Sequence, residues 1–216
     1  MTLYETVLYD EPSTLRGQIG RRSNLDGKNP HDETPLYFAA SYGRIECLEL
    51  LVSGGATVDR ANYQGRTPLH MAHANTECID ILLHYGADVR ARDMDGRTPL
   101  HLACAYGNDQ GVRSLVRHGA DMSCRDKFGA TPLHMAYASA KCIGVLLRRG
   151  ANVRARDKKG QTALHWVCAH GNMEGIRSLL AYEADIDIPD KKGITPFDLV
   201  PEEMKEMIER IWVEFL

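Results

Sequence analysis

A short motif recurs along the chain at a nearly fixed spacing. Thr-Pro-Leu, or a close variant, begins at Thr34, Thr67, Thr98, Thr131, Thr162 and Thr195. The intervals between successive threonines are 33, 31, 33, 31 and 33 residues. A unit of this length cannot bury a hydrophobic core alone, so the chain is expected to stack similar units against one another.

Each unit has the pattern of two short helices. The Thr is expected to cap the first helix, and the Pro after it suits the first helical position, where a missing N–H group costs nothing. The second helix is expected in stretches such as "ECIDILLHYGAD", where Ile79, Leu82 and Leu83 share one stripe and Gly86 ends the helix. Helices this short do not persist alone in water, so packing between units must stabilise them.

These motifs resemble the ankyrin-repeat family, whose signature is T-P-L-H-x-A and whose period is 33 residues. The resemblance covers residues 24–200 in about six repeats with alternating 33- and 31-residue spacing. It implies an all-α fold, a solenoid of helix–turn–helix units with projecting β-hairpin or loop tips.

The two ends depart from the repeat pattern. Residues 1–23 are expected to form a degenerate N-terminal capping repeat, and residues 201–216 a C-terminal capping helix. The apolar stripe of that helix would consist of Met204, Ile208, Ile211 and Phe215. The alternative for this helix is partner docking with Trp212 as the anchor.

The repeats alternate in length. The 31-residue repeats, at Thr67 and Thr131, lack the glycine that the others carry between their helices. Residues 62–92 match residues 126–156 at 18 of 31 positions, which indicates duplication of a two-repeat unit. Only the short repeats place a large residue, His73 or Tyr137, at one inner position. We expect these two side chains to fill volume that the shorter turn opens.

The stretch "TPLHMAHANTEC" has the residue types of a reactive site, but the repeat explains most of it. His70 has equivalents in His101, His134 and His165, and the resemblance implies that this histidine forms hydrogen bonds between adjacent turns. The position of Cys78 holds Cys or Gly in the other repeats, so it favours small size. Cys124 alone has no repeat equivalent and is expected to be the most reactive thiol.

Other motifs for chemistry are missing. The chain contains no phosphate-binding loop, no G-x-S-x-G and no H-E-x-x-H, and no cysteine spacing typical of structural zinc. The aspartates before each turn are interpreted as turn formers. The sequence therefore predicts no enzyme, no metal site and no cofactor.

Composition restricts the partners. The net charge is -3 and no stretch is apolar enough to span a bilayer, which disfavours nucleic acid and membranes. The six cysteines form no C-x-x-C pair, and the first residues lack the pattern of an export signal. We expect a monomer in the cytoplasm, the nucleus or both.

Function is expected where the repeat leaves residues unexplained. The resemblance implies that partners meet the concave face, built from loop tips and the exposed side of the inner helices. The candidate partner-binding residues on that face are Tyr63, Gln64, Arg66, Asn75, Met94, Asp95, Arg97, Tyr106, Lys127, Phe128, Ser139, Lys158, Lys159 and His170.

Three of the candidates, Tyr63, Tyr106 and Phe128, are aromatic residues that the scaffold does not require. Residues 152–161 carry four positive charges and one negative. This combination predicts a non-catalytic adaptor or scaffold module that binds another protein, with an acidic or phosphorylated segment as the favoured ligand. The alternative is a nucleic-acid-binding module that uses the basic tips and aromatic residues.

Overall fold

The computed structural model describes residues 2–20 and 24–213, and this part of the chain contains helices and loops but no β-strand. The chain divides into two compact units. The first comprises residues 1–100 and 114–120, and the second comprises residues 101–113 and 121–216. Helices α7 (Pro99–Ala105) and α8 (Asp109–Arg117) each contribute residues to both units.

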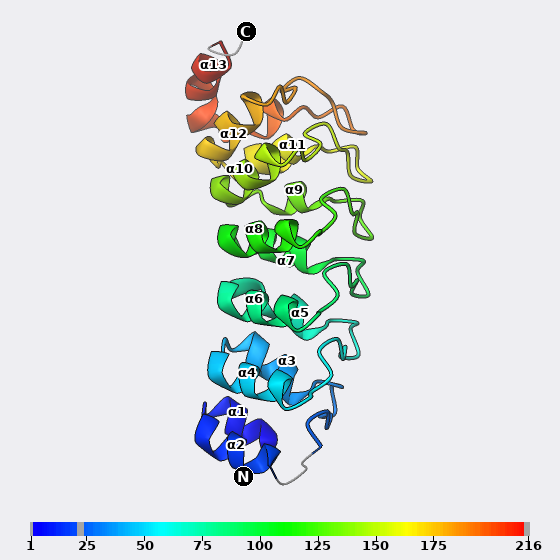
Figure 1. Cartoon of the computed structure of the whole chain (residues 1–216). Coiled ribbons are helices and arrows are strands. Elements are labelled where there is room, and N and C mark those ends of the chain that lie inside the picture. The colour runs from blue at the N-terminus through cyan, green and yellow to red at the C-terminus, as the bar shows by residue number, and fades with distance from the viewer. Residues whose placement is uncertain (1, 21–23, 214–216) are drawn as a thin grey trace. The chain divides into compact units, whose positions relative to one another are not determined.

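In the first unit, helices pack in two layers with the loops projecting beyond the inner one (Figure 1). The inner layer consists of α1 (Leu3–Leu8), α3 (Pro35–Ser41) and α5 (Pro68–Met71), which the 3₁₀ turn η1 (Ala72–Ala74) extends. The outer layer consists of α2 (Pro12–Ile19), α4 (Ile45–Ser53) and α6 (Thr76–His84). Fully buried leucines and isoleucines, such as Leu48, Leu69 and Ile79, fill the space between the layers.

The second unit repeats this arrangement. Its inner layer contains α9 (Pro132–Met135) and α11 (Ala163–Ala169), and its outer layer contains α10 (Ala140–Arg148) and α12 (Met173–Leu180). The 3₁₀ turns η2 (Phe197–Leu199) and η3 (Glu202–Met204) then lead into α13 (Lys205–Val213), which packs on α12. The expected helix–turn–helix fold is confirmed in both units.

Helix α13 buries the centre of its expected apolar stripe. Ile208 and Ile211 are buried, and Met204 and Trp212 are half-buried. Phe215, the last member of the stripe, lies outside the described residues. The described part of the stripe is therefore buried within the second unit, where α13 contacts α12.

Side chains cap both helices of a repeat, as the sequence predicts. Thr34 Oγ1 accepts the Tyr37 N–H at 3.2 Å, and Pro35 occupies the first position of α3. Four outer helices, α6, α8, α10 and α12, begin at side-chain oxygens that each accept an N–H three residues later, those of Asn75, Asn108, Ser139 and Asn172. Helices α2 and α4 begin without such a bond. These bonds satisfy backbone donors that a helix start otherwise leaves unpaired.

In four of the repeats, a buried histidine links the inner helix to the next loop. The Thr131 N–H donates to Nδ1 of His134 at 3.1 Å, and Nε2 of the same ring contacts the Gln161 carbonyl oxygen at 3.0 Å. Since Nδ1 accepts, the ring is neutral and Nε2–H donates. The equivalent bonds to a loop carbonyl come from His70, His101 and His165. The expected hydrogen bond between adjacent turns is confirmed.

Each loop is organised by one side-chain oxygen at its base. Asp126 Oδ1 accepts the N–H groups of Phe128 and Ala130 at 2.8 and 2.9 Å. The same double acceptance is made by Asn62, Asp93, Asp157 and Asp190. Turn formation is therefore the role of these aspartates.

One backbone hydrogen bond joins neighbouring loop tips within a unit. The Lys158 N–H donates to the Phe128 carbonyl at 2.9 Å, and the Lys191 N–H donates to the Lys159 carbonyl at 3.0 Å. In the first unit, the Met94 N–H donates to the Gln64 carbonyl at 2.9 Å. The tips are therefore held at a fixed spacing by their backbones, which leaves their side chains available.

The large residues of the short repeats do not stand free in solvent. His73 is half-buried, and its Nδ1 contacts the His70 carbonyl oxygen at 3.0 Å. Tyr137 is half-buried against the rings of Trp166 and His170. Both placements meet the condition that the volume-filling hypothesis set.

Two loop glycines allow a controlled test of the tip spacing. Gly129 and Gly150 have φ angles of 80° and 85°, so alanine is strained by about 1–2 kcal/mol at either position. A Cβ added at Gly129 would also lie 2.9 Å from the Lys158 backbone nitrogen. A Cβ added at Gly150 would have no neighbouring atom within 4 Å. We expect Gly129→Ala to destabilise the fold by about 1 kcal/mol more than Gly150→Ala in urea titrations. Equal losses of stability in the two variants would mean that the backbone around Gly129 and Lys158 shifts apart at no energetic cost.

The buried histidines predict a pH dependence. Desolvation lowers the pKa of His70, His134 and His165 below 6.5, so the unfolded chain binds more protons than the folded chain as pH falls below that value. The neutral histidines therefore make their full contribution to the free energy of unfolding above pH 6.5. This contribution is lost as the pH falls toward the lowered native pKa values.

His134→Gln keeps an acceptor for the Thr131 N–H but removes one titrating ring. The variant should lose about 1 kcal/mol at neutral pH, because the bond to Gln161 is lost, and should show a shallower loss of stability on mild acidification. Urea unfolding across this range measures both effects. An unchanged slope would contradict the assignment.

Candidate functional site

Five predicted site residues of the first unit line one hollow between two loop tips. Tyr63, Gln64 and Arg66 come from one loop, and Met94 and Asp95 from the next. The hollow has a volume of about 250 Å³, and Asp93 also contributes to its wall. The Tyr63 ring is 52% exposed and Met94 is 75% exposed, so both present apolar surface at the rim.

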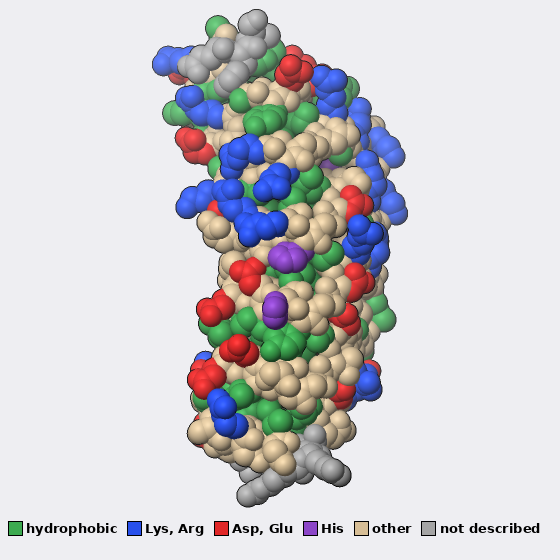
Figure 2. All heavy atoms as spheres, in the orientation of Figure 1, with side chains coloured by type: hydrophobic (Ala, Val, Ile, Leu, Met, Phe, Trp, Pro, Cys, Tyr) green, Lys and Arg blue, Asp and Glu red, His purple; other side chains and the backbone are tan. Residues whose placement is uncertain are grey.

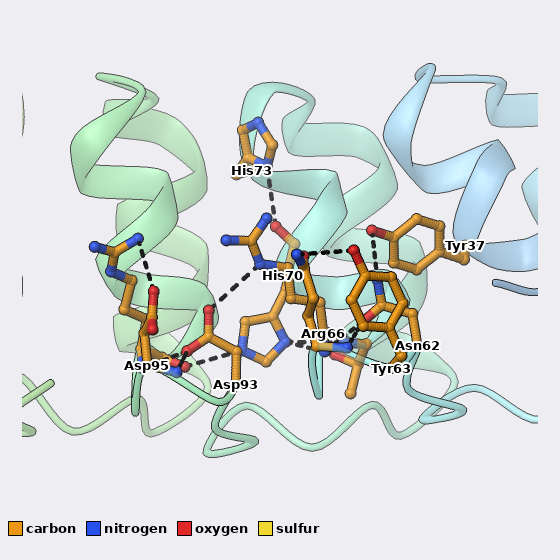
Figure 3. Close-up of polar contacts among 11 residues, drawn as sticks. Tyr37, Asn62, Tyr63, Arg66, His70, His73, Asp93 and Asp95 are labelled. Carbon is orange, nitrogen blue, oxygen red and sulfur yellow. Dashed lines mark hydrogen bonds and ion pairs between the residues drawn. The ribbon is translucent and has the colours of Figure 1, made fainter. Parts of the chain in front are cut away.

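Arg66 in this hollow and Arg97 beside it are tied to the scaffold (Figure 3). Arg66 Nε lies 3.4 Å from Oδ2 of Asp93, whose side chain is almost fully buried. Arg97 Nη1 lies 3.6 Å from Oδ2 of Asp95. Both arginines are half-buried, so their charges are largely paired within the loops, and the apolar groups of Tyr63 and Met94 dominate the outer surface.

The tips of the second unit are basic. Lys127 and Phe128 form one tip, and Lys158 and Lys159 form the next, with all four side chains exposed. The Lys127 ammonium lies 5.1 Å from the centre of the Phe128 ring, a cation–π contact. Figure 2 shows lysine and arginine side chains along this loop edge. The third tip adds Lys191 and Lys192, also exposed.

An aromatic cluster lies on the inner helices of the second unit. The rings of Tyr137 and His170 have their centres 4.0 Å apart, and Tyr137 lies 5.9 Å from Trp166. His170 is exposed, while Tyr137 and Trp166 are half-buried. Trp166 Nε1 donates to Asp157 Oδ2 at 3.3 Å, which links the cluster to a loop base. These rings form a partly exposed, rigid surface beside the basic tips.

The sequence interpretation named His170 but missed Tyr137 and Trp166 as surface residues. A signal for Trp166 existed, because the residue after the repeat histidine is Met71, Leu102 or Met135 elsewhere. Tyr42, which is 53% exposed at the end of α3, was also missed. It precedes the inter-helix glycine, as Tyr106 and His170 do in the other long repeats.

The remaining predicted residues divide between surface and scaffold. Tyr106 is 65% exposed at the end of the inner helix α7. Asn75 and Ser139 are half-buried, and their side-chain oxygens are occupied as helix caps by the N–H groups of Cys78 and Cys142. Their main contribution is therefore to the start of α6 and α10.

The residue types capable of chemistry are mostly occupied. Among the described residues, no group of three or more His, Cys, Asp or Glu side chains is arranged to hold a metal ion. Five of the six cysteines are buried, and burial raises the pKa of Cys47 and Cys168 to about 12. No helix in residues 2–20 and 24–213 has the length and apolar character to cross a membrane.

Models of ankyrin repeats match most of the sequence. A model of three ankyrin repeats matches residues 5–93 and 91–157, and a model of many copies matches residues 146–200. The chain belongs to the ankyrin repeat family. Ankyrin repeat domains generally mediate protein–protein interaction and are typically non-catalytic.

Curated relatives align over short stretches. The human transient receptor potential cation channel subfamily A member 1 is 36% identical over 67 residues, which are 30% of this chain and 6% of that protein. Human ankyrin repeat and SOCS box protein 11 is 33% identical over 70 residues, 32% of this chain and 21% of that protein. Chicken inversin is 36% identical over 71 residues, which are 32% of this chain and 6% of that protein. The matched ankyrin repeats thus span a small share of each relative.

Solved ankyrin domains are similar over the whole chain. The ankyrin repeat domain of human ASB11 has a TM-score of 0.87 and 23% identity, and the match covers 100% of this chain and 98% of that one. The ankyrin repeat domain of Bcl-3 has a TM-score of 0.79 and 29% identity, covering 97% and 98%. The first of these similarities concerns the fold alone.

The thiols of the ankyrin repeats should differ sharply in reactivity. Cys124 is half-buried, whereas the other five cysteines are buried and have raised pKa values. Because the thiolate is the nucleophile that displaces iodide from iodoacetamide, the native protein at pH 8 should be alkylated at Cys124 alone, as measured by peptide mass spectrometry. Cys124→Ser should abolish this modification, while all thiols react in urea. Comparable labelling of Cys47 or Cys168 in the native protein would contradict the buried placement.

Proposed function

We propose that this chain is a non-catalytic protein-interaction module, an adaptor or scaffold that binds a partner segment on its loop tips and inner helices. The partner contact in the second unit centres on Phe128, Tyr137, Trp166 and His170, with the lysines of the tips beside them. The module acts as a monomer in the cytoplasm, the nucleus or both.

The observation that carries this proposal is the exposure of Phe128. Its loop already satisfies its own backbone needs through Asp126, Gly129 and the bond to Lys158. The Phe128 side chain is nevertheless 51% exposed at the tip, with a lysine ammonium over its ring. Exposed aromatic residues on a rigid support are typical of binding hot spots, because they bury a large area at little entropic cost.

The charge of the tips indicates the class of segment. Three successive tips carry lysine: the first has the pair Lys127–Phe128, and the next two have the lysine pairs 158–159 and 191–192. Their backbones are linked, so the ammonium groups form a row of defined spacing. Such a row favours an acidic or phosphorylated peptide, whose charges the lysines pair while its apolar side chains contact the rings.

Nucleic acid is less well served by this surface. The guanidinium of Arg125 donates to the carbonyls of Gly129 and Arg156, and that of Arg156 donates to the carbonyls of Gly160 and Pro189. These two arginines therefore hold loops together. The tip lysines are exposed, and the aromatic rings are gathered in a cluster rather than spaced along a groove, which favours a peptide.

The catalytic alternatives have even less support. The residue types best suited to acid–base or nucleophilic work, His134, His165 and Cys168, are buried in scaffold positions. Both imidazole nitrogens of His134 and His165 contact backbone groups of the repeat. A binding role therefore accounts for the exposed residues and a scaffold role for the buried ones.

A quantitative pull-down from cell lysate tests the proposal. The chain should retain one or a few proteins that the triple variant Tyr106→Ala, Phe128→Ala, Lys158→Glu loses, with about tenfold or greater depletion by mass spectrometry. All three residues belong to the second unit and are exposed. Their replacement should leave the thermal transition in place.

A matched control is Tyr182→Ala, Met207→Ala, Arg210→Glu, which changes one aromatic, one apolar and one basic residue on α13 and just after α12. These residues are exposed as well. The control should keep the partner. Retention by the loop variant and loss by the control would contradict the proposed surface.

A further inference from the structure

A second candidate surface lies on the outer helices of the second unit. The first turns of α8, the middle of α10 and part of α12 surround a hollow of about 660 Å³. Arg113, Lys141 and Arg148 bring positive charge to its wall, and Asp109 and Glu174 bring negative charge. Figure 2 shows lysine and arginine side chains gathered over these helices.

Helix α10 contributes a glycine, Gly144, to the wall of this hollow. The position of Gly144 is held by Glu49, Asp80, Arg113 and Arg177 in the other outer helices. Gly144 has no positive φ, and the atoms nearest to an added Cβ belong to the Arg148 guanidinium, at 3.1 Å. A glycine inside a helix costs about 1 kcal/mol relative to alanine, so neither backbone geometry nor helix stability explains it.

The near-duplicate repeats isolate this surface further. Residues 76–85 and 140–149 keep the same buried Cys, Ile and Leu residues, yet their exposed faces differ. Glu77, Asp80, His84 and Tyr85 in the first become Lys141, Gly144, Arg148 and Arg149 in the second. The formal charge of this face changes from -2 (Glu77 and Asp80) to +3 (Lys141, Arg148 and Arg149) while the core is retained.

The positive charges on α10 are available to a ligand. In residues 2–20 and 24–213, Lys141, Arg148 and Arg149 form no ion pair with a carboxylate, and all three side chains are exposed. Arg113 is shared with Asp109 at 3.7 Å. Lys141 and Arg148 line the hollow itself, and Arg149 follows directly at the end of α10. An isolated surface cation is ordinary, but several cations close together form a local field that attracts carboxylates.

We propose that this outer-helix hollow binds an acidic peptide segment of a protein partner, with Lys141, Arg148 and Arg113 pairing its carboxylates over Gly144. The interspersed Asp109 and Glu174 favour a segment with spaced charges over the dense phosphates of nucleic acid or a flat anionic membrane. Because the hollow is formed by the outer layer, a partner can bind there while another occupies the loops and inner helices.

Fluorescence anisotropy with the full chain tests the hollow. The probe is a fluorescein-labelled peptide of alternating Glu and Ala, and a Gln–Ala peptide serves as its neutral control. The outer variant, Lys141→Glu, Gly144→Asp, Arg148→His, installs the residues that α6 carries at the same positions, so the scaffold already accommodates them. The matched control variant, Arg60→Glu, Arg90→Glu, replaces two exposed arginines of the first unit that belong to neither proposed surface and changes the formal charge by the same -4.

The expected result is binding of the Glu–Ala peptide that the outer variant weakens about tenfold and the control variant leaves within about twofold. The Gln–Ala peptide should not bind. Equal weakening by both variants would reduce the effect to net charge and overturn the proposal. Full binding by the outer variant, together with loss of binding in a Lys158→Glu, Lys159→Glu variant, would also overturn it and would assign the acidic peptide to the loop tips.

Three parallel measurements exclude other occupants. Vesicles of phosphatidylcholine with phosphatidylserine, or a single-stranded DNA oligonucleotide, would overturn the proposal if they bound more tightly than the peptide and lost affinity in the outer variant. Sedimentation that showed self-association lost in the same variant would assign the hollow to a second copy. If the outer variant fails to fold, the single variant Lys141→Glu, at an exposed position, is measured in its place. Its expected loss of affinity for the Glu–Ala peptide is smaller.

Discussion

The hydrogen bond between a buried imidazole and the carbonyl of the next loop is the contact on which the order of this structure depends. One ring ties the start of its own helix, through Nδ1, to the following repeat, through Nε2. Loops that project from short helices would otherwise be free to tilt. The imidazole bond and the single backbone bond between neighbouring tips together set the direction in which each tip side chain points.

The sequence predicted the fold because the constraints of a repeat are local. Thr, Pro, His, Gly and Asp each meet one requirement of a cap, a turn or a link, and these requirements recur with the period. The turn-forming role of Asp126 followed from the pattern, and the hydrogen bond of His134 from the resemblance to ankyrin repeats. The grouping of Tyr137, Trp166 and His170 did not, because it depends on the rotamers of three residues that differ between repeats.

The charged loop residues show the same limit. Arg66 and Asp93 stand 27 positions apart and meet because one loop stacks on the next, so a linear pattern counts Arg66 as free when its charge is paired. Gly144 is the opposite case. In the sequence it looks like any other small residue of the chain. Its significance becomes visible only in the structure, where Arg113, Lys141 and Arg148 surround it.

The histidine links also bear on how the chain reaches its native state. Each spans only 27 or 29 residues, so forming any one of them closes a loop of nearly the same length as any other. The entropy of loop closure changes slowly with length and therefore does not rank the repeats. Local stability alone decides which pair of repeats forms first, and folding then spreads from that pair to its neighbours. Substitutions that weaken one link redirect the order of folding without changing its topology.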